Sequence, residues 1–213
     1  MASKYELPTV RSQLLEFVRD AYPETFEGLS PSKALGGSVF SGPAPHPNEV
    51  LNLFIQQGLT SALPIAYYMA ARRGISSLMD RRLPRSTTLP LDVLQSVTQG
   101  LMALRELELI ETHRLIFEPE ASPLCSTLTC PSRNRTGPVA LDAHRRVFNC
   151  VVGSSRFGTK VLQVPEFYVY HGGVRLAFDN DFCPECVEGW KFGHADLRRK
   201  VWAKLPEVFG LEG

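Results

Sequence analysis

Apolar residues recur at helical spacing through the first half of the chain. In residues 7–21 they lie three and four positions apart with charged residues between them, a pattern typical of an amphipathic helix. Similar spacing predicts helices over residues 48–57, 61–73 and 91–111. The segment 61–73 is apolar on nearly every side, so we expect it inside a core.

Proline and glycine mark the expected ends of these helices. Pro47 suits the first position of the second helix and Gly58 suits its end, because proline fits a first helical turn and glycine adopts a left-handed cap. Residues 28–47 are rich in Gly, Pro and Ser and predict a loop. Glu108 falls on the apolar stripe of the last of these helices, so we expect its final turn to be exposed or to bend away.

The pattern changes after Phe117. Residues 119–138 predict a loop, whereas 140–152 and 184–204 predict helices. Residues 166–178 alternate around a Gly-Gly pair, which predicts either a β-hairpin or irregular chain packed on the helices.

Together these elements predict a mainly α fold, an irregular multi-helix array with a small loop-rich, cysteine-containing C-terminal portion. We expect a helical region over residues 1–117 and a Cys-containing helical and loop region over residues 118–213, packed on the first.

Composition and charge narrow the class of protein. Hydrophobic residues make up 44% of the chain and charged residues 21%, which is close to the globular average and excludes wholesale disorder. Lys+Arg number 23 against 22 Asp+Glu, so the basic footprint of a dedicated nucleic-acid binder is missing. We interpret the basic runs at residues 145–146 and 198–200 as solvated helix faces.

The sequence predicts neither a membrane span nor a secretory signal. The most apolar stretch, residues 59–71, is shorter than a membrane span, and the first ten residues lack the apolar core of a signal peptide. We therefore expect an intracellular protein of the cytoplasm or nucleus, where thiols stay reduced. Its expected partners are other proteins, not a membrane, a nucleic acid or a small-molecule substrate.

The five cysteines all lie in the second half of the chain, and four of them form local pairs. Cys125 and Cys130 make a C-x4-C, and Cys183 and Cys186 make a C-x-x-C after 52 intervening residues. A structural zinc ion takes four tetrahedral ligands, and two local pairs supply two each. The spacing therefore predicts these four cysteines as the ligands of a structural zinc ion.

Two other interpretations of the cysteines stay open. On a helix beginning at Pro184, His194 shares one inward stripe with Cys186, so Cys183, Cys186 and His194 could supply three ligands, with Cys125 or Cys130 as the fourth. Alternatively the thiols are reduced, buried residues that act as small hydrophobic side chains, and His194 is a hydrogen-bonded core residue.

Catalytic motifs are missing from the sequence. No G-x-S-x-G, P-loop, G-x-G-x-x-G or H-E-x-x-H occurs. The C-x-x-C at a helix N-terminus suits a redox thiol, but it lies late in the chain, where no second half of a thioredoxin-like sheet can follow. We expect a non-enzyme. The alternative is a metal- or thiol-dependent enzyme that uses Cys183, Cys186 and His194.

Several segments resemble the region that follows the BTB/POZ core in a large group of fungal proteins. They occur in the same order as in that group, at residues 4–11 (KYELPTVR), 46–50 (HPNEV), 62–68 (ALPIAYY), 183–186 (CPEC) and 201–211 (VWAKLPEVFGL). In that group the first three belong to successive helices. The resemblance implies a BACK-like helical region that serves as a protein-interaction or scaffold module, with no catalytic residues.

The BTB core itself would lie before residue 1. We therefore expect the chain to be the C-terminal part of such a protein or a truncated relative. The resemblance implies no metal site, so the zinc prediction depends on cysteine spacing alone.

Overall fold

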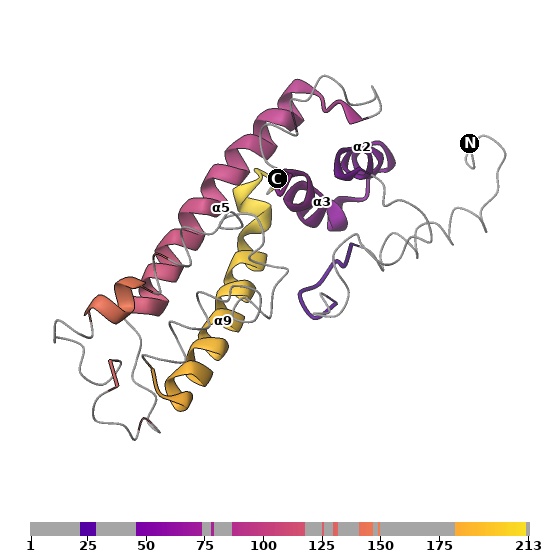
Figure 1. Ribbon diagram of the computed structural model, residues 1–213. Coiled ribbons are helices and arrows are strands. Elements are labelled where there is room, and N and C mark those ends of the chain that lie inside the picture. Colours follow the sequence, from indigo (N-terminus) through magenta and orange to yellow (C-terminus); the bar gives the residue numbers. More distant parts are fainter. Residues whose placement is uncertain are drawn as a thin grey trace. The chain divides into compact units, whose positions relative to one another are not determined.

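The computed structural model describes residues 22–28, 46–73, 78, 87–117, 125, 130–131, 141–146, 149 and 182–211 (Figure 1). Within these ranges every regular element is helical, which confirms the mainly α prediction. The main elements among these residues are α2 (Pro47–Gln57), the 3₁₀ turn η1 (Thr60–Ala62), α3 (Leu63–Ala71), α5 (Leu91–Phe117) and α9 (Pro184–Val208). The helix predicted over 7–21 and the hairpin predicted over 166–178 lie outside the described residues.

The chain forms two compact units. The first comprises Met1–Leu101 together with Lys204–Gly213, and the second comprises Met102–Ala203. Each of the long helices α5 and α9 therefore contributes residues to both units. The division predicted at residue 117 stays a prediction.

Helix α2 begins and ends as its sequence predicts. Pro47 occupies its first turn, and the backbone N–H of Asn48 donates to Nδ1 of His46 over 3.3 Å. Gly58 closes the helix with a φ of 65°, and its N–H donates to the carbonyl of Ile55. A residue with a Cβ would be strained at that left-handed φ, so the glycine fixes where α2 stops.

Helix α3 lies in the core of the first unit. Its residues from Ile65 to Ala71 are all buried, which confirms the expectation of an all-round apolar helix. The helix begins at Leu63, directly after the turn η1. Pro64 suits its first turn, because proline has no N–H and could not donate a hydrogen bond to a preceding turn of the same helix.

Two asparagines of α2 bind the residues that precede α5. Asn48 is fully buried, and its Nδ2 donates to the carbonyl of Thr87 over 3.0 Å. One turn later, Nδ2 of Asn52 donates to the carbonyl of Thr88 over 3.1 Å. These bonds satisfy backbone carbonyls that precede the helix and hold its start against α2.

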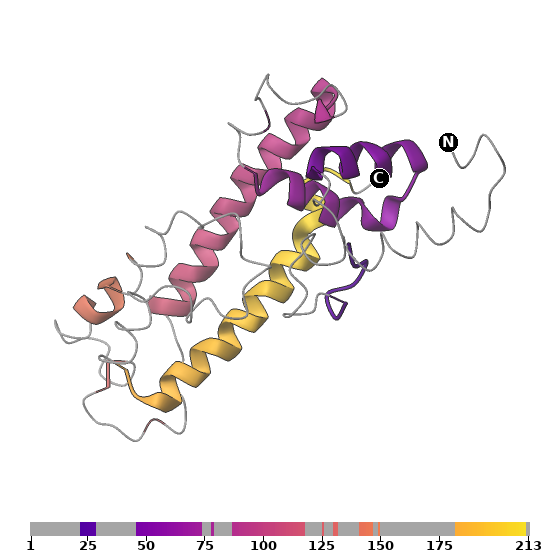
Figure 2. The same ribbon diagram turned by 45° about the vertical axis from the view of Figure 1, so that its right-hand side comes forward.

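Helix α5 is longer than its apolar pattern indicates. It continues to Phe117, and Glu108 is buried with only 4% of its surface exposed. Glu108 itself is therefore buried, whereas its neighbours Leu109 and Ile110 expose 40% and 44% of their surface, as expected for this turn. In the second unit α5 runs beside α9 in the opposite direction (Figures 1 and 2), and Nζ of Lys200 pairs with Glu111 over 3.1 Å. This ion pair connects the last turns of α5 to α9.

The aromatic ring of Phe209 lies directly against the backbone of Gly100. A Cβ built at Gly100 would lie 2.1 Å from Cδ1 of the ring. Phe209 is buried, and its ring centroid is 5.4 Å from that of Tyr67. The glycine inside α5 is therefore required by close packing, even though glycine weakens a helix.

Among the described residues, no helix is both long enough and apolar enough to cross a membrane.

We predict that Gly100→Ala destabilises the protein. Alanine favours helix by about 1 kcal/mol over glycine, but its methyl group overlaps the buried Phe209 ring, and overpacking of this kind costs about 1–3 kcal/mol. The net expectation is a loss of up to about 2 kcal/mol in the free energy of unfolding, measured by urea titration. Gln99→Ala, at an exposed neighbouring position of α5, is the matched control and should leave stability unchanged or slightly higher. A Gly100→Ala variant more stable than the wild type would contradict the packing argument.

Candidate metal centre

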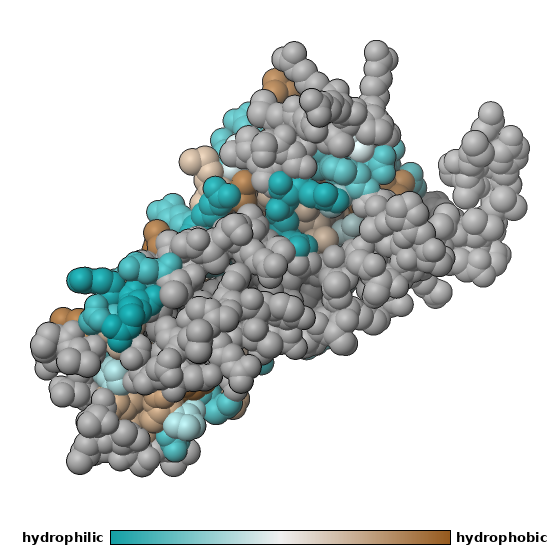
Figure 3. Space-filling view, viewed as in Figure 1, coloured by the Kyte–Doolittle hydropathy of each residue, from teal (hydrophilic) through white to brown (hydrophobic). Residues whose placement is uncertain are grey.

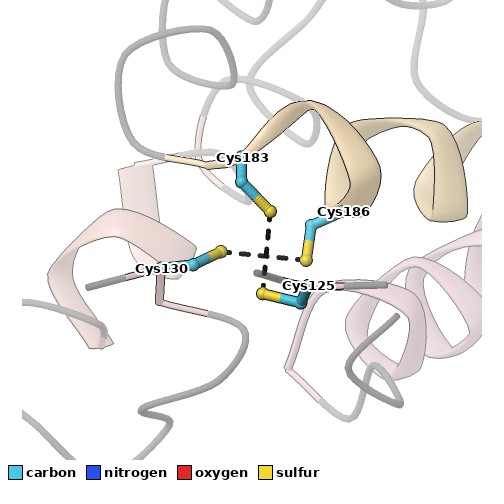
Figure 4. Close-up of side chains that lie close together, drawn as sticks. All are labelled: Cys125, Cys130, Cys183 and Cys186. Atoms are coloured by element: carbon cyan, nitrogen blue, oxygen red, sulfur yellow. Dashed lines mark hydrogen bonds between the residues drawn. The ribbon is translucent and has the colours of Figure 1, made fainter. Parts of the chain in front are cut away.

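The four cysteines predicted from their spacing come together in the second unit. Their Sγ atoms all lie within 4.8 Å of one another (Figure 4). The Sγ atoms of Cys125 and Cys183 are 3.6 Å apart, and those of Cys130 and Cys186 are 3.7 Å apart. These two contacts cross near the centre of the cluster, so each joins a thiol of one sequence pair to a thiol of the other.

The sulfur distances suit a tetrahedral metal ion. With a zinc–sulfur bond of about 2.3 Å, neighbouring sulfurs of a regular tetrahedron lie about 3.8 Å apart. The two cross-pair contacts come within a few tenths of an ångström of that value. A disulfide would require about 2.05 Å, and none of the four cysteines forms a disulfide in the structure. The cluster could hold one metal ion with four sulfur ligands.

The beginning of α9 positions one pair of thiols. Cys183 immediately precedes the helix, and its carbonyl accepts the N–H groups of Cys186 and Val187 over 3.0 Å each. Pro184 occupies the first helical position, where its lack of an N–H costs nothing. The first turn thereby places both thiols of the C-x-x-C on one side of the helix start, facing Cys125 and Cys130 (Figure 4).

The thiols are removed from water. Cys130 and Cys186 are 2% and 3% exposed, and Cys125, the most open of the four, is 9% exposed. Burial is the main cause that raises the pKa of Cys183 to about 12, and burial likewise raises the pKa of Cys125. In the absence of a cation these groups are therefore neutral thiols. A metal ion must displace their protons, so binding releases protons to solvent.

Aromatic rings pack beside the start of α9. The ring centroids of Phe182 and Trp190 are 4.5 Å apart, and His144 meets Phe182 edge-on at 5.2 Å. His144 belongs to residues 141–146, which are helical as the sequence predicts for 140–152. Its ring contacts are non-local, so no local spacing signal could have revealed them.

His194 lies outside the cysteine cluster. It is buried on the predicted inward stripe of α9, together with Cys186, Trp190, Leu197 and Val201. Eight residues separate it from Cys186, a rise of about 12 Å along the helix axis, and the group of close ligand atoms contains only the four cysteines. Burial is the main cause that lowers its pKa to about 4, and the charge of Arg198 lowers it further.

The basic residues 198–200 of α9 differ in their exposure to solvent. Arg198 is buried, contrary to the expected solvated face, whereas Arg199 and Lys200 are exposed. Lys200 pairs with Glu111 and with Asp196. Because Lys200 has carboxylate partners and Arg198 is buried, the run does not present three free cations in a row.

In comparisons with known proteins, no family model, curated protein or solved structure matches the chain.

We predict that His194 makes stability depend on pH. Its pKa is about 4 in the folded protein and about 6.5 when unfolded, so only the unfolded state binds the proton between these values. The contribution is complete above about pH 6.5 and is lost as the pH falls towards 4. His194→Gln should remove on the order of 2–3 kcal/mol of this pH dependence, measured as the free energy of unfolding at several pH values.

If the cysteine cluster holds a metal ion, acid would also protonate its thiolates, so the informative quantity is the difference in slope between variant and wild type. His113→Gln, at an exposed position of α5, is the control and should follow the wild-type slope. If the free energy of unfolding of His194→Gln changes with pH in parallel with that of the wild type from pH 7 to 4, His194 is not the source of the pH dependence.

Proposed function

We propose that the chain is a non-catalytic, helical protein-interaction or scaffold module that is held together by one structural zinc ion. Cys125, Cys130, Cys183 and Cys186 are the proposed ligands. The observation that carries the proposal is the pair of crossing sulfur contacts at 3.6 and 3.7 Å, made by four buried thiols.

The chemistry of the ligands favours zinc over other divalent ions. Thiolates are soft ligands, and a tetrahedral set of four sulfurs is typical of zinc or iron. Oxygen-seeking ions such as calcium and magnesium require carboxylates and carbonyls, and the cluster offers sulfur only. Iron is the competing occupant, and a metal analysis distinguishes the two.

The completeness of the ligand set supports a structural role over catalysis. A catalytic zinc ion keeps one position for water or substrate, whereas four cysteines fill every position of a tetrahedron. An enzyme built on Cys183, Cys186 and His194 would need the histidine at the cluster, and it lies about two turns further along α9. Thiols with a raised pKa are also poor nucleophiles at neutral pH.

A metal ion here would connect segments that are distant in sequence. The contacts span 58 and 56 positions of the chain. Closing a loop of this length costs conformational entropy of the chain, and local structure does not offset that cost. Binding free energy of the metal becomes folding free energy because the unfolded chain lacks the assembled site. The ion would thus fix the segment around Cys125 and Cys130 to the start of α9.

The interaction role is supported by exposed apolar side chains and by the resemblance to the post-BTB region. Met102 and Phe192 expose 65% and 76% of their surface, and small hydrophobic patches lie among hydrophilic ones in the coloured part of the face drawn in Figure 3. The segments 46–50 and 62–68, which carry part of the resemblance, lie in α2 and in η1 with α3, the helical structure that the resemblance implies. A BTB-type assembly is accordingly the proposed context of the module.

We predict that protein purified without added metal contains one equivalent of zinc. Removal of the ion by a chelator, or the substitution Cys186→Ser, should abolish zinc binding and lower stability by several kcal/mol, because the metal contributes to folding. Zinc is measured by plasma mass spectrometry and unfolding by circular dichroism.

Cys150→Ser is the matched control. Four thiols already complete the tetrahedron, so this variant should keep one zinc per chain and an unchanged melting temperature. Wild-type protein that holds no metal, and whose melting temperature chelators leave unchanged, would overturn the structural zinc. A Cys183→Ser variant that folds normally but loses a hydrolytic or thiol-dependent activity would favour the enzyme interpretation instead.

A further inference from the structure

We infer that a peroxide converts the zinc-loaded cluster into two disulfides, Cys125–Cys183 and Cys130–Cys186, and that the metal is released. The inference rests on the proposed function, because bound zinc keeps the four sulfurs in the reactive thiolate form. It adds a regulated second state of the same site, in which covalent bonds replace the ion.

The cross-pair arrangement of the sulfurs determines which bonds form. Sequence spacing alone favours local disulfides within the C-x-x-C and the C-x4-C. In the structure all four sulfurs lie within 4.8 Å of one another, and two contacts between different pairs measure 3.6 Å for Cys125 and Cys183 and 3.7 Å for Cys130 and Cys186 (Figure 4). Each contact must close by roughly 1.6 Å to reach disulfide length.

Oxidation begins at the most accessible sulfur. Cys125 is the most exposed of the four, and a thiolate there attacks one oxygen of hydrogen peroxide. The O–O bond breaks, hydroxide leaves and Cys125 becomes a sulfenic acid. The Cys183 thiolate then attacks Sγ of Cys125, so that the S–S bond forms, the S–O bond breaks and a second hydroxide leaves.

A second peroxide oxidises Cys130 and Cys186 in the same way. In total, four thiolates lose four electrons, two peroxides accept them, and the products are two disulfides and four hydroxides. Disulfide sulfurs no longer carry the negative charge that zinc requires, so the ion leaves as Zn²⁺.

The cross-pair bonds preserve the connection that the metal made. Each links the segment around Cys125 and Cys130 to the beginning of α9, as the ion does. Local disulfides would cut that connection, because each would close only within its own segment. The oxidised protein should therefore be metal-free and yet remain folded, whereas chelation of the reduced protein removes the connection altogether.

The test uses the full chain with Cys150→Ser, so that the four cluster cysteines are the only thiols. Zinc content is measured first, and the protein is then treated with hydrogen peroxide while released zinc is followed with a colorimetric chelator. Trypsin places Cys125 and Cys130 in one peptide, residues 115–133, and Cys183 and Cys186 in another, residues 176–191. Cross-pair disulfides join these two peptides, whereas local disulfides leave them separate.

Further cleavage assigns the individual bonds. Glu-C cuts after Glu185, between Cys183 and Cys186, and chymotrypsin cuts after Leu128, between Cys125 and Cys130. We expect release of one zinc per chain, loss of all four thiols, and fragments that link Cys125 to Cys183 and Cys130 to Cys186. The oxidised protein should keep a cooperative thermal transition that a reductant with a chelator abolishes.

Three results would overturn the inference. Local disulfides, Cys125 linked to Cys186, or sulfinic acids in a protein that first contained zinc would refute the cross-pair bonds while the structural zinc stands. Retention of zinc and all four thiols under peroxide would refute the oxidation but not the metal site. A protein with no zinc before oxidation would refute both, and the initial metal analysis identifies that case.

Discussion

The contact between the two cysteine pairs is the interaction on which the second unit depends. It joins residues 58 and 56 positions apart, and it buries four sulfurs that are poor hydrogen-bonding groups. Neutral thiols gain little from one another, so apolar burial alone holds them there in the absence of a cation. A tetrahedral ion changes this balance because four charge-bearing bonds replace weak contacts. The same closeness that suits a metal also places cross-pair sulfurs where they can form disulfides.

The helices beside this cluster are held by contacts of a different kind. The inner stripe of α9 buries Cys186, Trp190, His194, Leu197 and Val201. Outside that stripe, Lys200 reaches Glu111 of α5, an exposed ion pair of the kind that contributes about 1 kcal/mol or less. Burial therefore decides the orientation of α9, and the ion pair adds only modestly to it. His194 is accordingly part of the buried stripe of α9 and not of the cysteine cluster.

Local sequence signals predicted the helices that have clear ends. Pro47 and Gly58 bracket α2 in the structure as they do in the pattern, and Pro184 opens α9. Where such a signal is missing, the predicted boundary was wrong: the pattern predicts an end at residue 111, and α5 continues to Phe117. Periodicity reports which face of a helix is apolar, but it contains no information about a partner that covers a polar residue on that face.

The sequence by itself determined the helical class, the start of α9 and the four candidate ligands, because each follows from spacing within a few residues. Only the tertiary structure decided that Cys125 meets Cys183 and Cys130 meets Cys186. It also showed that His194 stays outside the cluster and that Gly100 makes room for Phe209. These are contacts between residues far apart in the chain. They depend on how whole helices pack, and no local pattern of side chains encodes that packing.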